Sequence, residues 1–265
     1  MSSTTPVVST TRLRAEVAIV LLLSLGFSGL WAFTRFVERY FKETPIADQR
    51  TTLNSSAAAN AVRYEEVFES VFQILRLVAA LAPVALVFFL LGSAAIRHFG
   101  LFWSGEGARS WGFDLRWAAI LTASIGLPGL AVYAVGRAIG QTVEIDTSGL
   151  PSGWWSIILL VLAAVAAGVL EETVGVAYVV TRLRQLGYST VVILIFCAML
   201  RASYHLYQGW PMALGNAAMG VLFTLFFLRT GRVMPLVAAH ITLDLFSFVG
   251  PEVLPDSFLE WLGVA

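Results

Sequence analysis

The stretch WWSIILLVLAAVAAGVLEETVGVAYVVTRLRQLG, residues 154–187, decides the fold. It opens with a long apolar run, carries two adjacent glutamates near its centre, and ends in a basic turn at Gly187. Roughly 20 apolar residues cross the hydrocarbon core of a bilayer. In lipid such a run satisfies its backbone as a helix, since a barrel strand would alternate apolar and polar side chains. We therefore predict a transmembrane helix with two carboxylates inside the membrane.

The rest of the chain has the same apolar character. Of its 265 residues, 58% are hydrophobic and 13% are charged, whereas a soluble domain carries about 25% charged residues. The formal net charge is zero, so no nucleic-acid partner is indicated. The single cysteine, Cys197, cannot form an internal disulfide. We predict an all-α fold, a polytopic transmembrane helical bundle with about seven spans. The predicted spans are 15–34, 70–96, 117–137, 154–181, 188–207, 211–228 and 233–249.

Charged residues in the loops predict the orientation. Arginines precede the first span and follow the second, fourth and sixth, whereas the loops after the third and seventh spans carry only acidic charge. Because basic loops stay on the cytoplasmic side, we expect the N terminus inside. The connection 35–66 has balanced charge and is expected outside. We predict N-terminal transmembrane helices with a polar loop in residues 1–150, a C-terminal helical core in 151–250 and a tail in 251–265.

Six ionisable residues lie inside the predicted spans of the C-terminal half. An ionisable residue within a span is costly in free energy and is by default a candidate functional group. The fourth span carries a pair, the fifth carries a cation and a histidine, and the seventh carries a histidine with an aspartate four residues later. The six residues are Glu171, Glu172, Arg201, His205, His240 and Asp244.

Their spacing predicts that they converge. Glu171 and His205 are almost equally far from the turn at Gly187, so an antiparallel hairpin brings them to the same depth. Glu171 lies about 16 Å along its helix from the basic end of the fourth span, and His240 lies about 12 Å from the basic start of the seventh. His240 and Asp244 share one helix face. Each residue alone is also compatible with an interhelical hydrogen bond or ion pair.

Three segments resemble the motifs of the CPBP (CAAX protease and bacteriocin-processing) family, also called the Abi family, of intramembrane proteases. The glutamate pair with the following basic Leu-Gly turn resembles the first motif. The segment 201–205 resembles the second motif, which ends in histidine, and the segment 240–244 resembles the third. The resemblance covers about the last 100 residues and departs at two positions. Val176 stands where the family has arginine, and Arg201 stands where it has phenylalanine.

The resemblance implies roles for the six residues. Glu171 would be the general base that activates water, with His205 helping to hold that water. His240 would stabilise the oxyanion, and Asp244, in place of asparagine, would orient His240 as its hydrogen-bond acceptor. Glu172 would support the base or contact substrate. By the hairpin register Arg201 lies opposite Val176, so we expect it to pair with a glutamate and keep the base ionised.

We therefore expect an intramembrane endopeptidase that acts on a membrane-associated peptide or protein in the plasma membrane of a bacterium. The lipid bilayer and that substrate are its expected partners, and no cofactor is expected. A zinc ion on Glu171, His205 and His240 is the alternative to metal-free water activation, although a HExxH helix is absent. The alternative functions are a catalytically inactive membrane scaffold or bacteriocin-immunity protein, and a proton-coupled transporter.

Overall fold

The computed structural model describes residues 9–52, 63–92, 99–100, 111–146, 154–253, 255 and 257. Part of the predicted polar loop, part of the basic loop after the second span and most of the predicted tail lie outside the described residues. The helices are α1 (Thr10–Leu22), α2 (Leu25–Tyr40), α3 (Arg63–Ala80), α4 (Ala82–Leu91), α6 (Trp111–Ala138), α7 (Trp154–Leu170), α8 (Val179–Gln185), α9 (Thr190–His205), α10 (Trp210–Thr230) and α11 (Met234–Val253). The shorter elements are the 3₁₀ helices η1 (Ile46–Asp48) and η3 (Leu206–Gln208), the π-helix η2 (Glu171–Tyr178), and the strands β1 (Arg50–Thr52) and β2 (Glu144–Asp146).

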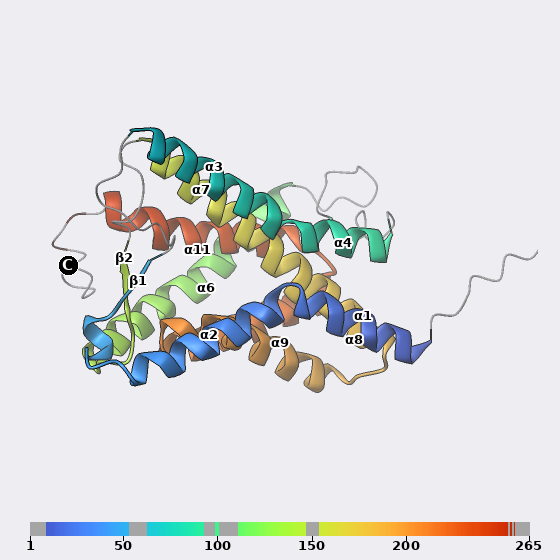
Figure 1. Ribbon diagram of the computed structural model, residues 1–265. Helices are drawn as coiled ribbons and strands as arrows, with labels where there is room; N and C mark the ends of the chain where they lie inside the picture. The colour runs from blue at the N-terminus through green and yellow to red at the C-terminus, as the bar shows by residue number, and fades with distance from the viewer. Residues whose placement is uncertain are drawn as a thin grey trace, which may run out of the picture.

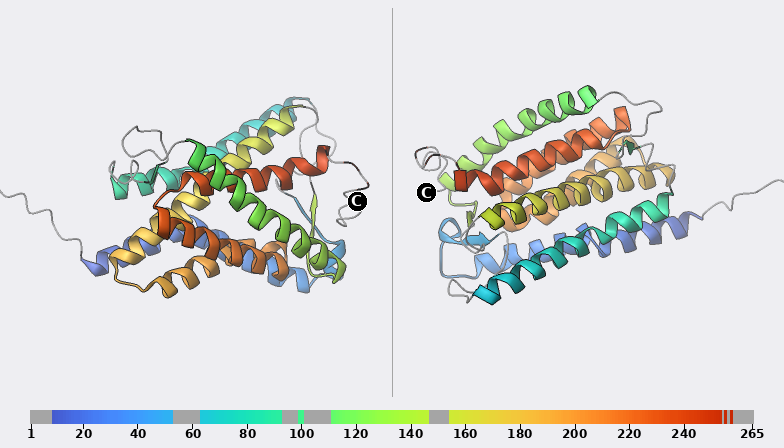
Figure 2. Two further views of the ribbon diagram at one scale, coloured as in Figure 1. Left: turned by 180° about the vertical axis from the view of Figure 1, so that it is seen from behind. Right: turned by 90° about the horizontal axis from the view of Figure 1, so that it is seen from above.

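The helices form two layers. In one layer α11 packs between α6 and α7, and α3 packs on the other side of α7 (Figure 2). In the other layer α9 packs between α2 and α10. The continuous helix formed by α7, η2 and α8 runs diagonally from the first layer, near α3, to the second, near α1 (Figure 1). Its central segment η2 therefore contacts helices of both layers, namely α2, α4, α9, α10 and α11.

The core lies around this crossing. Tyr178, Phe223 and Leu236 are among the largest fully buried side chains, and they come from η2, α10 and α11. Large apolar side chains also remain exposed on the outer faces of most helices, as Phe89 and Leu127 do. Such exposed apolar faces are expected of helices that contact lipid. The fold is that of an integral membrane protein, as predicted.

The number of spans is not confirmed as seven. Five helices or helix combinations are long and apolar enough to cross a membrane, and α1 with α2 adds a sixth if the bent pair is one span. The predicted seventh helix is present, but its apolar part, Met234–Gly250, is shorter than a full span by the same measure. The bundle character of the prediction holds, and the count of full spans is five or six among the described residues.

Two predicted spans are broken helices. The first bends by 49° between α1 and α2, where Ser24 leaves helical geometry and its hydroxyl donates to the Val20 carbonyl at 2.6 Å. A serine that bonds its own backbone competes with the helical ladder. The second is interrupted at Leu81, two residues before Pro83, because proline lacks the N–H that the preceding turn needs. Neither break was predicted.

One small sheet departs from the all-α prediction. β1 and β2 pair in parallel, with Arg50 opposite Glu144 and Thr52 opposite Asp146. This pairing ties the connection after α2 to the connection after α6. Arg137, in the last turn of α6, reinforces it by donating to the Ala47 carbonyl at 2.6 Å. Three-residue strands carry too little alternation to be recognised in a sequence.

Candidate active site

The two glutamates begin a π-helix. Glu171 and Glu172 are the first residues of η2, which separates two ordinary α-helical segments. π-Helical turns are rare and often occur at functional sites. Gly175, within η2, lets α2 come close, since a Cβ there would lie 2.9 Å from Leu25 Cδ1.

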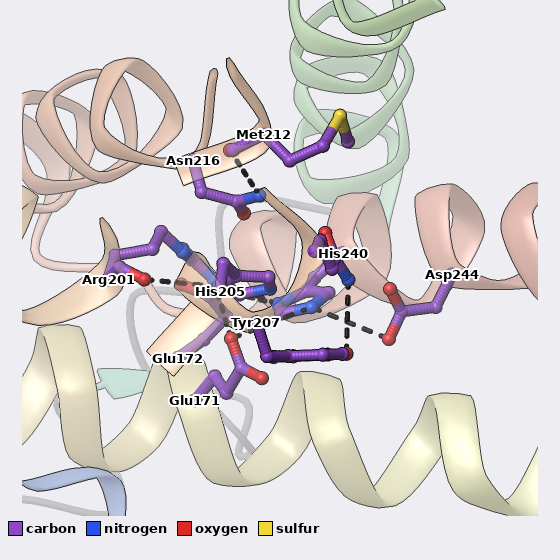
Figure 3. Close-up of polar contacts among 10 residues, drawn as sticks. Glu171, Glu172, Arg201, His205, Tyr207, Met212, Asn216, His240 and Asp244 are labelled. Carbon is purple, nitrogen blue, oxygen red and sulfur yellow. Dashed lines mark hydrogen bonds and ion pairs between the residues drawn. The ribbon is translucent and has the colours of Figure 1, made fainter. Parts of the chain in front are cut away.

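Arg201 forms an ion pair with each glutamate, as the hairpin register predicted. Its Nη2 lies 3.3 Å from Glu171 Oε2 and in direct contact with Glu172 Oε1. The arginine comes from α9 and is buried, with 3% of its surface exposed. One guanidinium therefore supplies the positive charge for two adjacent carboxylates inside the protein (Figure 3).

His240 is oriented by Glu172, where the sequence had predicted Asp244. Its Nδ1 lies 2.6 Å from Glu172 Oε1 and 3.1 Å from Arg201 Nη2. A carboxylate only accepts hydrogen bonds, so the shorter contact of 2.6 Å requires Nδ1–H to donate to Glu172, and Arg201 Nη2 then contacts Nδ1 without donating to it. The Nε2 atom then faces two other carboxylates, Asp244 at 3.5 Å and Glu171 at 3.8 Å. Asp244 therefore contacts His240 at Nε2, and Glu172 is a second partner, at Nδ1, that the sequence did not predict.

His205 lies at the C-terminal end of α9, one helical turn after Arg201. Its Nδ1 lies 3.1 Å from the Arg201 carbonyl, so the Nδ1–H donates to the backbone. This hydrogen bond leaves Nε2 of the neutral ring as an acceptor. The ring packs against Tyr204, with the ring centroids 4.8 Å apart. His205 and His240 come from different helices and lie on the same side of the glutamate pair in Figure 3.

The two glutamates differ in access. Glu172 is fully buried, whereas 14% of the Glu171 side chain is exposed. A small pocket reaches Glu171, and Val176, Arg201 and Tyr204 also line it. Of the two carboxylates, Glu171 is therefore the one that faces this pocket, which is about the size of a water molecule.

The approach of the surrounding helices depends on small residues. A Cβ on Gly220 of α10 would lie 3.1 Å from the Ala198 Cα, so α9 and α10 pack backbone to backbone beneath Arg201. A Cβ on Gly168 of α7 would lie 2.8 Å from Ile241 of α11. Small residues permit such close helix contacts in membrane proteins. These contacts hold Arg201 and His240 against the glutamate pair.

A candidate metal-binding group lies within the described part of the chain. Glu171, Glu172 and His240 each offer one ligand atom, and these atoms lie within 4.8 Å of one another. This group differs from the predicted zinc triad, because Glu172 replaces His205. Arg201 Nη2 contacts all three residues of the group. A guanidinium already provides the positive charge that a metal ion would bring.

Two further residues of the site were not predicted, although both lie next to predicted residues. Tyr204 precedes His205 and lines the pocket. Tyr207 lies two residues after His205, in η3, and its side chain extends toward Asp244 in Figure 3. The available signal was the sequence YHLYQ, a polar and aromatic cluster at the end of an apolar helix.

Comparison with known proteins supports the family resemblance. Residues 153–246 match the family model described as type II CAAX prenyl endopeptidase Rce1-like. The match confirms the predicted resemblance to the CPBP family, and it contains all six ionisable residues of the site. Over this segment, which is less than half of the chain, the protein is similar to CAAX-protease-type membrane peptidases. No curated protein and no solved structure gives a significant match to the chain.

Proposed function

We propose that this protein is an intramembrane endopeptidase that hydrolyses a peptide bond in a membrane-associated peptide or protein, with water activated by Glu171. The observation that carries the proposal is the difference between the adjacent carboxylates. Glu172 is enclosed by Arg201 and His240, whereas Glu171 is partly exposed and reaches a small pocket that Arg201 also lines. A general base must reach the water from which it takes the proton.

The described side chains support each part of the reaction. Glu171 takes a proton from water, whose oxygen attacks the carbonyl carbon, and later delivers that proton to the leaving amine. His205 accepts a hydrogen bond from the water through Nε2, because its Nδ1–H is held by the Arg201 carbonyl. His240 faces the site through Nε2 and donates to the developing oxyanion as an imidazolium. Glu172 holds that ring through Nδ1.

Arg201 keeps the base ionised in this proposal. Two adjacent buried carboxylates repel each other, and a base that is protonated cannot accept the proton of water. The guanidinium is always charged and contacts both carboxylates. This arrangement supports metal-free water activation.

A separate experiment tests whether the activity depends on a bound metal ion. Purified active protein should contain less than stoichiometric zinc and should keep its activity in the presence of a chelator. Loss of activity to the chelator with recovery on added zinc would establish the metal-dependent alternative. Arg201→Ala provides a positive control, because it leaves Glu171, Glu172 and His240 without the guanidinium between them. We expect this variant to bind zinc more tightly than the wild type.

The proposed function is tested by comparing membrane peptides from cells that express the wild type or Glu171→Gln. Peptides that depend on Glu171 should then be cleaved by the purified protein in liposomes. A peptide ending in a farnesylated CAAX sequence is assayed in parallel, because the family model describes prenyl endopeptidases. Circular dichroism and thermal unfolding should show that Glu171→Gln folds like the wild type. Equal cleavage by both proteins would overturn the assignment of Glu171.

A catalytically inactive scaffold or bacteriocin-immunity protein is the second candidate. It is favoured by Asp244, because an ionised carboxylate beside the site repels an oxyanion. For this function, partner binding or protection of cells would persist in the Glu171→Gln and His205→Ala variants. Under the endopeptidase proposal, both substitutions remove the activity while the bundle remains folded.

A further inference from the structure

The 3₁₀ turn that follows His205 places a phenol beside the candidate active site. Tyr207 is half-buried in η3. In Figure 3 its side chain lies between the labelled carboxylates of Glu171 and Asp244. Tyr207 is therefore a polar group of the site that none of the three motif segments contains.

The hydroxyl of Tyr207 retains its own hydrogen for donation. Gln208 Nε2 donates to Tyr207 Oη at 3.1 Å, and an amide nitrogen cannot accept a hydrogen bond. The phenolic oxygen is therefore the acceptor in this pair. Among the described residues, no hydrogen bond donated by the Tyr207 hydroxyl is present.

The backbone around Tyr207 is fixed from two sides. The buried Arg39 at the end of α2 donates through Nε to the Tyr207 carbonyl at 3.1 Å. The Val143 N–H donates to the Gln208 carbonyl at 3.1 Å from the connection after α6. The Tyr207 ring also packs edge-on against Trp31, with the ring centroids 6.0 Å apart. A donor held in this way needs little reorganisation when charge develops in a reaction.

The site needs such a donor because Asp244 cannot be one when ionised. A carboxylate only accepts hydrogen bonds, and its charge opposes a neighbouring oxyanion. Besides Tyr207, the group beside Asp244 that can donate a hydrogen bond is Nε2 of His240, which lies 3.5 Å from the Asp244 carboxylate. One donor leaves the oxyanion only partly stabilised, whereas two or more donors are usual in oxyanion holes.

We propose that Tyr207 is a catalytic residue that donates its phenolic hydrogen to the oxyanion, together with His240. This inference rests on the proposed function. When the water oxygen bonds to the carbonyl carbon, the π electron pair moves onto the carbonyl oxygen, which then accepts the hydrogen bonds. No proton leaves Tyr207. The C–N bond breaks when the oxyanion re-forms the carbonyl, and the amine takes the proton held by Glu171.

The test measures kcat and KM of Tyr207→Phe in liposomes, with the peptide whose cleavage depends on Glu171. We expect kcat to fall about 100-fold, as for loss of one oxyanion donor, with KM within about twofold of the wild type. Tyr40→Phe is the matched control, because its hydroxyl contacts Gln141 at 3.2 Å on the exposed end of α2. It should leave kcat unchanged. A kcat for Tyr207→Phe equal to that of the wild type would overturn the inference.

Repeating the substitution in an Asp244→Asn variant separates an effect of Tyr207 on catalysis from an effect on folding. Asp244→Asn introduces an amide donor at the position of the carboxylate, so Tyr207→Phe should cost only about 10-fold in kcat in this background. An equal loss in both backgrounds would show that Tyr207 only supports the fold. If the phenylalanine variant fails to fold, fluorotyrosine at position 207 keeps the ring and strengthens the donor. Its kcat should then rise, and an unchanged kcat would count against donation.

The failure of the proposed function has a different outcome. In that case the wild type and Glu171→Gln cleave every peptide equally or not at all, and the inference about Tyr207 falls with it. If cleavage depends on Glu171 but is unchanged in Tyr207→Phe, the proposed function stands and only the role of Tyr207 is overturned.

Discussion

Nδ1 of His240 lies 2.6 Å from Oε1 of Glu172, a contact that joins α11 to η2 across 68 positions of the chain. The same carboxylate oxygen also contacts Arg201. Since Glu172 is fully buried, this oxygen orients an imidazole and balances a guanidinium without reaching the pocket. This geometry supports the proposal that Glu172 positions His240 while Glu171 acts as the base.

The first prediction concerns the second glutamate of the pair. Glu172→Gln removes the buried charge that faces Arg201 and His240, so it should lower the free energy of unfolding by about 3 kcal/mol. Misorientation of His240 should also lower kcat at least about 10-fold. Denaturant unfolding in detergent micelles and the liposome cleavage assay measure the two effects. Glu171→Gln is the comparison, with loss of activity and a smaller stability cost. A Glu172→Gln protein as stable as the wild type would contradict the positioning role.

The second prediction concerns the positive charge that Arg201 places beside Glu171 and Glu172. Arg201→Leu leaves Glu171 and Glu172 without their shared guanidinium, so activity should fall about 100-fold. Val176 lines the same pocket. An arginine there, in the Arg201→Leu background, should restore about one tenth of the activity or more. The single variant Val176→Arg is the control and should not exceed the wild type. Full activity of Arg201→Leu would show that the ion pair only joins helices.

The convergence of the site was predictable because ionisable residues are rare in lipid and their depth follows from helix rise. The ion pair of Arg201 with the glutamates followed from the hairpin turn at Gly187, where the backbone indeed reverses with φ +81°. Such arguments use only distance along a helix and the position of a turn. They therefore locate residues by depth, and they do not specify which atoms meet.

The details that escaped prediction depend on packing between distant segments. η2 is a π-helix within a stretch whose sequence predicts one continuous helix, and its neighbours come from five other helices. The contact of His240 Nδ1 with Glu172, in addition to the contact of Nε2 with Asp244, depends on the rotation of α11 against η2. The bend at Ser24 depends on a side chain that many helices tolerate. None of these features leaves a periodic signal in the sequence.

The third prediction concerns a polar cluster away from the site. Arg182 Nε donates to Glu16 at 2.7 Å, and Tyr178 donates to the same carboxylate at 3.0 Å. Both side chains of the ion pair are mostly buried. Glu16→Ala should therefore lower the free energy of unfolding by about 3 kcal/mol, because it leaves the mostly buried charge of Arg182 without its carboxylate partner.

The control for this prediction is an exposed ion pair. Arg35 and Glu38 lie 2.8 Å apart with almost half of each side chain exposed. Arg35→Ala should change stability by less than about 1 kcal/mol. Denaturant unfolding in micelles compares the two variants. Equal effects would mean that burial does not determine the strength of these pairs.

The last prediction tests whether kcat depends on the position of η3, the turn that carries Tyr207. Gly209 follows η3 with φ +112°, and a Cβ there would collide with the carbonyl oxygen of Gln141. Gly209→Ala should therefore lower the free energy of unfolding by about 2 kcal/mol. The clash should also displace η3 and lower kcat about 10-fold.

Gly187→Ala separates backbone strain from displacement of the site. Gly187 also has a positive φ, +81°, but a Cβ there would meet no atom within 4 Å. Its substitution should cost about 1 kcal/mol and leave kcat unchanged. Both variants place a side chain at a glycine with positive φ, but only Gly209→Ala is expected to move η3. A loss of kcat in Gly209→Ala alone would therefore show that kcat depends on the position of the turn that carries Tyr207. Equal kcat in the two variants would show that the placement of η3 does not limit the reaction.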